Sequence, residues 1–216
     1  SEMCGNNGEV VPSENADFKP SSPYATAKVF GHMTTRNYSD CYGIFACSGI
    51  MFNHESPLRG LEFVSRKITH NAVRIKLGLA GEIRLGNMKA KRDWGYAYDY
   101  VKAMWLMLQQ DEPDDYVIGT GKSYSVEEFL KKTFEYLKLD YKKYLKIDEK
   151  YFRPSDVGHL LCDPKKAMNK LAWDPSCTSL DRLISIMVDA DLNYLQGKPE
   201  ITIEEPNVLS NSCAIS

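Results

Sequence analysis

The feature that most constrains the fold is an apolar run from Tyr42 to Phe52, YGIFACSGIMF, which contains no charged residue. A strand that is apolar on both faces is typical of a parallel sheet with helices on both sides. Helical spacing of apolar residues occurs in 62–77, 96–110, 125–137, 163–171 and 179–194, and short strand-like runs occur at 82–85 and 115–119. This alternation of helices and strands predicts an α/β chain with a parallel sheet.

Local signals predict where two helices begin. Ser22 followed by Pro23 is typical of an N-cap and a first helical position, so we expect a helix from Ser22 to about Tyr38. Ser125, with Glu128 three residues later, has the pattern of a capping box at the start of the helix expected over 125–137.

The charge balance argues against several classes of function. The 216 residues include 27 Lys plus Arg and 29 Asp plus Glu, a net charge of −2, so no broad basic surface is available for nucleic acid. No apolar run approaches the roughly 20 residues of a membrane span, and the first residues lack the apolar stretch of a signal peptide. The cysteines and histidines show no metal-ligand spacing, so we expect no metal site. The six scattered cysteines are typical of reduced thiols, so we expect a cytoplasmic protein.

The strongest chemical signal is the pattern Tyr24-Ala-Thr-Ala-Lys28. Residues four apart lie one turn from each other on the same face of a helix. An ammonium group at that distance stabilises a phenolate, which makes this tyrosine a candidate general base. The alternative interpretation is a core tyrosine beside a surface lysine, because the YxxxK pattern is common by chance.

Longer motifs extend this signal over nearly the whole chain, from Ser1 to about Leu195. They are SEM at 1–3, SPYATAK at 22–28, FNHESP at 52–57 with RG at 59–60, RKI at 66–68, LGNM at 85–88, RDWG at 92–95 with DYV at 99–101, YFRP at 151–154, DPKKA at 163–167 and LAW at 171–173. As an ordered set they resemble the extended short-chain dehydrogenase/reductases and, among these, the GDP-mannose 4,6-dehydratase family.

The resemblance implies an α/β fold that is the C-terminal part of a Rossmann-type parallel sheet with a smaller α/β substrate-binding lobe. The implied division of the chain has three parts. They are residues 1–52 with 91–120 as the remainder of the NADP-binding Rossmann-type domain, 53–90 and 121–196 mainly as the sugar-nucleotide-binding lobe, and 197–216 as a flexible tail.

The same resemblance implies roles for individual residues. Tyr24 would be the catalytic base, Lys28 would support it and hold the cofactor ribose, and Glu2 would be the carboxylate of the family's Thr-Ser-Glu triplet. His54 and Arg59 match positions that contact NADP. The segments expected to line the sugar-nucleotide pocket contribute Asn53, Arg66, Lys67, Leu85, Asn87, Arg92, Arg153 and Asp156.

The implied reaction is the NADP-dependent dehydration of GDP-mannose to GDP-4-keto-6-deoxymannose. It proceeds by oxidation at carbon 4, loss of water with the help of Glu2, and hydride return to carbon 6. A homo-oligomer is expected from the same resemblance. One alternative is a related nucleotide-sugar epimerase or reductase, whose reaction needs no acid/base like Glu2. Another is a truncated, non-catalytic protein that binds sugar nucleotides.

The sequence departs from the family in its dinucleotide-binding turn. Gly78, Gly81 and Gly86 are too far apart to form the Gly-rich turn that cradles a pyrophosphate, and they follow a helix. We therefore expect the chain as given to be an inactive fragment or to need a missing half. Cys162 stands where the family more often has Gly. The last four residues have the form of a prenylation box at Cys213, but the acidic residues upstream argue against lipidation and a membrane partner.

Overall fold

The computed structural model describes residues 1–5, 11–152 and 158–198. The helices are α1 (Pro23–Tyr42), α2 (Val64–Lys76), α3 (Ala97–Met107), α4 (Val126–Tyr136), α5 (Lys165–Leu171) and α6 (Leu180–Leu195). The strands are β1 (Gly49–Met51), β2 (Asn53–Glu55), β3 (Ile83–Leu85), β4 (Lys91–Arg92), β5 (Trp94–Tyr96), β6 (Tyr116–Ile118), β7 (Tyr124–Ser125) and β8 (Leu145–Ile147). Three short 3-10 helices are η1 (Glu2–Cys4), η2 (Tyr141–Lys143) and η3 (Glu149–Tyr151).

The strands pair in four two-stranded ladders. The pairs β1–β6, β2–β5 and β3–β8 are parallel, and β4–β7 is antiparallel. Each parallel pair is joined by a connection that contains at least one helix, which parallel strands require. The predicted α/β class with a parallel sheet is therefore confirmed.

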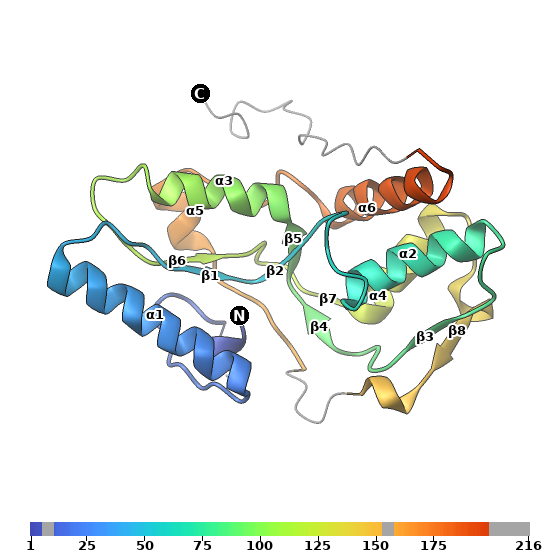
Figure 1. Ribbon diagram of the computed structural model, residues 1–216, viewed down its shortest axis with the longest axis horizontal. Helices are drawn as coiled ribbons and strands as arrows, with labels where there is room; N and C mark the ends of the chain where they lie inside the picture. Colours follow the sequence, from blue (N-terminus) through green and yellow to red (C-terminus); the bar gives the residue numbers. More distant parts are fainter. Residues whose placement is uncertain (6–10, 153–157, 199–216) are drawn as a thin grey trace.

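Helices cover both faces of the β1–β6 ladder. Figure 1 shows α1 on one side of this ladder and α3 with α5 on the other. The core between α3, α5 and β6 contains Tyr100, Ala103, Tyr116, Ala167 and Trp173. The indole N–H of Trp173 donates to the Asp99 carbonyl at 2.9 Å and so ties the loop after α5 to α3.

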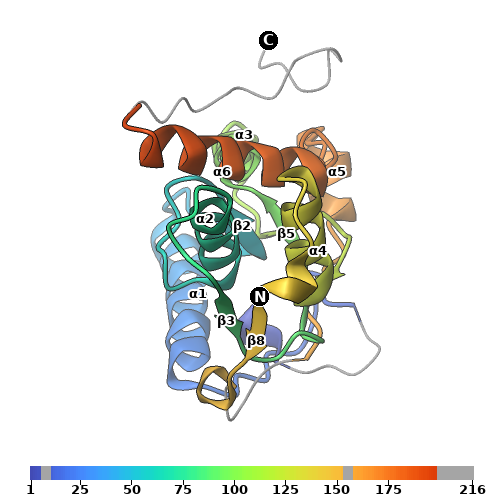
Figure 2. The same cartoon turned by 90° about the vertical axis from the view of Figure 1, so that its right-hand side faces the viewer.

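The largest core lies in the other half of the molecule, where α6 packs against α2 and α4. Figure 2 views this half end on, with β3 and β8 beside the three helices. Its fully buried side chains include Ile68, Phe129, Leu130, Phe134 and Met187. The division of the chain into domains stays a prediction, and residues 199–216 of the predicted tail lie outside the described residues.

The capping predictions are confirmed. The Ser22 hydroxyl accepts a hydrogen bond from the Ala25 amide at 3.1 Å, and Pro23 is the first residue of α1. Ser125 and Glu128 form the reciprocal capping box at the start of α4. All six predicted helices are present, with ends within a few residues of those expected.

The predicted strand from Tyr42 to Phe52 is wrong in its first half. Tyr42 is the last residue of α1, and Gly43 ends the helix in the left-handed region with φ 65°. Glycine adopts this conformation without the steric penalty of a Cβ atom, so it stops the helix here. Ile44 and Phe45 then lie exposed, and β1 begins only at Gly49.

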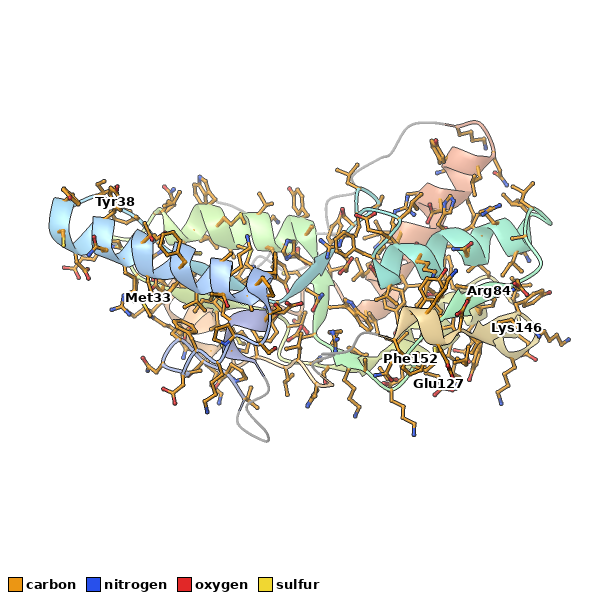
Figure 3. All side chains as sticks on the ribbon, turned by 60° about the horizontal axis from the view of Figure 1, so that its bottom comes forward. Met33, Tyr38, Arg84, Glu127, Lys146 and Phe152 are labelled. Atoms are coloured by element: carbon orange, nitrogen blue, oxygen red, sulfur yellow. The ribbon has the colours of Figure 1, made fainter. Side chains whose placement is uncertain are left out.

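Helix α1 exposes several large side chains on the sides that do not contact the ladder. Met33 and Tyr38, labelled in Figure 3, are 50% and 51% exposed.

Within the ranges that the structure describes, no helix is long and apolar enough to cross a membrane.

Candidate active site

Two segments, η1 and the start of α1, meet at the carboxyl end of β1. The Ser1 amino nitrogen donates to the Met51 carbonyl at 2.8 Å, which places η1 beside the end of the strand. η1 also packs against α1, and the Lys19 amide donates to the Met3 carbonyl at 2.9 Å. Figure 1 shows η1 next to the N-terminal end of α1. The structure therefore brings the segment of Glu2 and the first turns of α1 to one end of the ladder, where ligands bind in α/β sheets.

The predicted pair Tyr24 and Lys28 lies in the first two turns of α1. Tyr24 is 61% exposed, so its phenol is open to a ligand and does not belong to the core. The Lys28 Nζ atom lies 5.4 Å from the centre of the Tyr24 ring. Because Ser22 and Pro23 fix the start of the helix, the spacing of four residues places both side chains on one face.

Strand β2 carries Asn53 and His54. The His54 ring donates from Nδ1 to the Phe52 carbonyl at 3.0 Å, which leaves Nε2 as the other polar atom of the ring. The ring also lies 5.3 Å from that of Tyr100, whose hydroxyl donates to the Asn53 carbonyl at 3.4 Å. The Asn53 Oδ1 atom is buried and has no hydrogen-bond partner among the residues that the structure describes. A buried acceptor of this kind is suited to a donor from a ligand or an ordered water.

Arg59 lies in the turn between β2 and α2. Its Nε atom is 3.3 Å from the Oε2 atom of Glu55, and its Cζ atom lies 3.6 Å from the centre of the Phe63 ring. Glu55 is buried, and burial raises the pKa of its carboxyl. Glu55 belongs to the FNHESP motif, and the polar residues on either side of it, His54 and Ser56, give no sign in the sequence that it is buried.

The structure places Arg66 in a buried ion pair within the protein. Both oxygens of Asp191, which is fully buried in α6, accept hydrogen bonds from the Arg66 guanidinium. The Arg66 Nε atom donates to the Pro57 carbonyl at 2.9 Å. These contacts hold α2 against α6. The predicted contact of Arg66 with a sugar nucleotide stays a prediction.

A second group of predicted residues meets beside the β3–β8 ladder. The Lys67 Nζ atom lies 3.4 Å from the centre of the Tyr151 ring. Leu85 is buried at the end of β3, and its carbonyl accepts from the Asp148 amide at 2.9 Å. A Cβ atom on Gly86 would lie 2.5 Å from the Tyr151 carbonyl oxygen, so only glycine allows this approach. The Asn87 side chain accepts from the Lys89 amide at 3.0 Å in the turn that follows.

Arg92 ends β4 and is followed by a buried carboxylate. Asp93 is fully buried and accepts hydrogen bonds from the Thr120 amide at 2.9 Å, the Thr120 hydroxyl at 2.6 Å and the Gly121 amide at 2.9 Å. The Cys162 thiol donates to it at 3.2 Å. Burial raises the pKa of Asp93 and of Cys162. Asp93 thus ties the segment of Arg92 to the carboxyl end of β6, a role that its place in the RDWG motif did not reveal.

Two predicted substrate residues, Arg153 and Asp156, lie outside the described residues. The other predicted positions include two groups. The first, at the carboxyl end of β1, is the segment of Glu2 with Tyr24 and Lys28 of α1, and the second, beside β3, β8 and η3, contains Lys67, Leu85 and Asn87. Arg66 lies between α2 and α6, and Arg92 ends β4. Among the residues that the structure describes, no three His, Cys, Asp or Glu side chains gather as a metal site would require.

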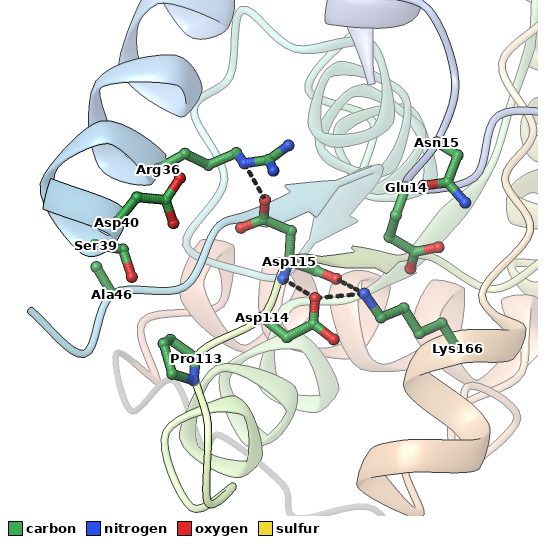
Figure 4. Close-up of a pocket in the computed structure, with 10 residues that line it drawn as sticks. All are labelled: Glu14, Asn15, Arg36, Ser39, Asp40, Ala46, Pro113, Asp114, Asp115 and Lys166. Atoms are coloured by element: carbon green, nitrogen blue, oxygen red, sulfur yellow. Dashed lines mark hydrogen bonds and ion pairs between the residues drawn. The ribbon is translucent and has the colours of Figure 1, made fainter. Parts of the chain in front are cut away.

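A cavity of about 210 Å³ lies at the opposite, amino ends of β1 and β6 (Figure 4). Several of its charged side chains have partners within the protein. Asp114 accepts from Lys166 at 2.6 Å, and Arg36 lies 3.9 Å from Asp115. The Glu14 carboxylate accepts from the Val117 amide of β6 at 2.7 Å. None of the residues that line the cavity is a predicted site residue, and it lies at the end of the strands opposite to the one where ligands bind in α/β sheets.

The fold is shared with Rossmann-like short-chain dehydrogenase/reductases of known structure. The RMD protein of Pseudomonas aeruginosa, complexed with NADPH, aligns with a TM-score of 0.80 at 17% identity, covering 89% of this chain and 64% of that one. UDP-glucose 4-epimerase of Thermus thermophilus, complexed with NAD, aligns with a TM-score of 0.75 at 24% identity, covering 88% and 60%. At these identities the likeness defines the fold class.

Sequence comparison defines the family. The profile of the GDP-mannose 4,6 dehydratase family matches residues 1–187. GDP-mannose 4,6 dehydratase 2 of Arabidopsis thaliana is 52% identical over 192 residues, covering 89% of this chain and 51% of the relative. The human GDP-mannose 4,6 dehydratase is 42% identical over 216 residues, covering 92% and 58%. The chain belongs to the GDP-mannose 4,6 dehydratase family, and it spans somewhat more than half the length of these relatives.

Proposed function

We propose that this chain supplies the proton-transfer residues and most of the sugar-nucleotide site of an NADP-dependent GDP-mannose 4,6-dehydratase. The observation that carries the proposal is the meeting of Tyr24 and Lys28 with the segment of Glu2 at the carboxyl end of β1. Membership of the family supports the choice of reaction and of GDP-mannose as substrate.

The residues present fit one side of a nicotinamide dinucleotide site. The Tyr24 phenol and the Lys28 ammonium are exposed beside each other, and His54 and Arg59 lie in β2 and the turn after it. Arginine suits phosphate because its planar guanidinium donates two parallel hydrogen bonds. The choice of NADP over NAD is supported by one structural neighbour, which holds NADPH. When bound, NADP would accept a hydride from carbon 4 of the sugar and return it to carbon 6.

In the proposed reaction, this chain's residues move the protons. Tyr24 enters this step as the phenolate, whose negative charge the Lys28 ammonium stabilises, and it takes the proton of the 4-hydroxyl to become the phenol. The 4-ketone that results acidifies the proton on carbon 5. Glu2 removes this proton and delivers one to the leaving 6-hydroxyl, which departs as water. An epimerase or a reductase has no such elimination, so Glu2 distinguishes the dehydratase from these relatives.

The second group of residues is proposed to hold the nucleotide part of the substrate. Lys67 lies over Tyr151 and next to the turn of Gly86 and Asn87, which combines a cation, an aromatic ring and an amide on one surface. Arg92 is proposed to pair with the diphosphate, since arginine binds phosphate oxygens bidentately. The predicted homo-oligomer and cytoplasmic location stay predictions.

The test replaces the matching half of the Arabidopsis relative with this chain and assays the chimera with GDP-mannose and NADP. We expect a product that is lighter than GDP-mannose by one water. Tyr24→Phe should abolish its formation, because the phenol proton acceptor is lost. Tyr38→Phe is the matched control, since it removes another exposed hydroxyl of α1 at a distance from the site. A folded chimera that binds GDP-mannose without forming this product would contradict the proposal and favour a non-catalytic binder.

A further inference from the structure

The carboxylate of Glu55 is buried between β2 and the start of α2, and the reaction proposed above does not use it. Glu55 is 2% exposed. Its Oε2 atom accepts a hydrogen bond from the Ser65 hydroxyl at 2.5 Å and lies 3.3 Å from the Arg59 Nε atom. A buried carboxylate is costly unless partners compensate for the lost water. Its position therefore requires an explanation in terms of these two partners.

Arg59 is held on two sides. Its guanidinium carbon lies 3.6 Å from the centre of the Phe63 ring, and Glu55 is on its Nε edge. The Nε atom is buried and makes no hydrogen bond to a residue that the structure describes, so its contact with Glu55 is an ion pair, whereas the side chain as a whole is 26% exposed. The exposure thus falls on other atoms of the side chain, which leaves part of Arg59 accessible to a ligand. An arginine fixed before binding loses less conformational freedom when a phosphate arrives.

The backbone that carries Arg59 is fixed as well. Its amide donates to the Ser56 carbonyl at 3.0 Å, and the Leu58 amide donates to the Ser56 hydroxyl at 3.1 Å. The Arg66 Nε atom donates to the Pro57 carbonyl at 2.9 Å. The turn is therefore held at several points without Glu55, and what Glu55 adds is contact with the side chain of Arg59.

We propose that Glu55 is a positioning residue that holds the Arg59 guanidinium for a phosphate group of the nicotinamide dinucleotide. The inference rests on the proposed function, because it takes Arg59 as a cofactor contact. Ser65 orients the carboxylate by occupying the same oxygen that faces Arg59. Loss of the Glu55 charge should free the guanidinium while the turn keeps its backbone hydrogen bonds.

The first test observes Arg59 directly in the full chain by nuclear magnetic resonance. The Nε–H signal of Arg59 is assigned by its loss in Arg59→Lys. We expect slow exchange of this hydrogen with water in the unsubstituted chain and clearly faster exchange in Glu55→Gln. Glu55→Asp, which keeps the charge, should restore part of the protection. Glu62→Gln is the matched control, because it removes an exposed glutamate from the same connection. Equal exchange in Glu55→Gln and the unsubstituted chain would overturn the proposal.

The second test measures the affinity of the chimera for NADP by calorimetry. Removing a hydrogen bond to a charged group corresponds to a loss of about tenfold to a hundredfold in affinity, which we expect for Arg59→Ala. Glu55→Gln should weaken binding in the same direction, and the double variant should bind no more weakly than Arg59→Ala. KM for NADP should rise in Glu55→Gln while kcat changes little.

The outcomes separate this inference from the proposed function. If Arg59→Ala weakens NADP binding and Glu55→Gln does not, the positioning role is refuted and the cofactor contact of Arg59 remains. If Arg59→Ala binds NADP as tightly as the unsubstituted chimera, Arg59 makes no contact and the positioning proposal fails, whereas dehydration by the chimera would still support the proposed function.

Discussion

Replacing Asp191 by alanine should destabilise the fold strongly, because it leaves the Arg66 charge buried without its partner. Asp191 is fully buried, and the Arg66 side chain is only 11% exposed. Removing one member of a buried ion pair costs about 3–5 kcal/mol. Arg66 keeps its hydrogen bond to the Pro57 carbonyl at 2.9 Å. We therefore expect a loss near the lower end of that range, about 3 kcal/mol.

Urea unfolding followed by circular dichroism measures this loss, provided that the slope of the transition is unchanged. Asp189→Ala is the matched control on the same helix, because the Asp189 carboxylate accepts only exposed hydrogen bonds from Tyr136 at 2.8 and 3.0 Å. It should lose no more than about 1 kcal/mol. Replacing both Arg66 and Asp191 by apolar residues should recover part of the loss, since no unpaired charge remains. Equal effects of Asp191→Ala and Asp189→Ala would refute the reasoning.

Three further changes test the local structure. Ser125→Ala should lower the free energy of unfolding by about 1 kcal/mol, because the capping box with Glu128 is lost, and thermal unfolding measures this. Gly119→Ala would place a Cβ atom 2.3 Å from the Cys162 sulfur, so we expect a loss of about 1–3 kcal/mol, which Cys162→Gly should relieve in the double variant. Burial raises the pKa of Glu55, so the folded state holds this proton more tightly than the unfolded state does. The free energy of unfolding of the unsubstituted chain, minus that of Glu55→Gln, should therefore fall as the pH rises above about 4. Urea unfolding at several pH values would contradict this if that quantity rose instead.

Local signals predicted the helices because their causes are local. Ser22 and Pro23 specify the start of α1, and the capping box at Ser125 specifies the start of α4. The apolar run after α1 misled the prediction, because apolar character alone does not tell a buried strand from the end of a helix. Gly43 ends the helix through its left-handed conformation, and the strand that pairs with β6 begins at Gly49.

In the candidate site too, sequence spacing predicted the contacts between neighbouring residues but not those between distant ones. Tyr24 and Lys28 lie one turn apart on one helix, so their pairing follows from sequence spacing. The ion pair of Arg66 and Asp191 joins residues 125 positions apart, and no periodicity in the sequence predicts it. The contact between Glu55 and Arg59 likewise depends on the path of the turn between β2 and α2, which no sequence signal specifies.

The most direct test of the central claim is Glu2→Gln in the chimera, assayed with GDP-mannose and NADP by mass spectrometry of the sugar nucleotide. We expect that no dehydrated product forms, while the variant still oxidises carbon 4 and exchanges hydride with the cofactor. Tyr24→Phe should instead lose both activities, since oxidation precedes the elimination. Dehydration by Glu2→Gln at the rate of the unsubstituted chimera would contradict the assignment of this chain's carboxylate to the loss of water.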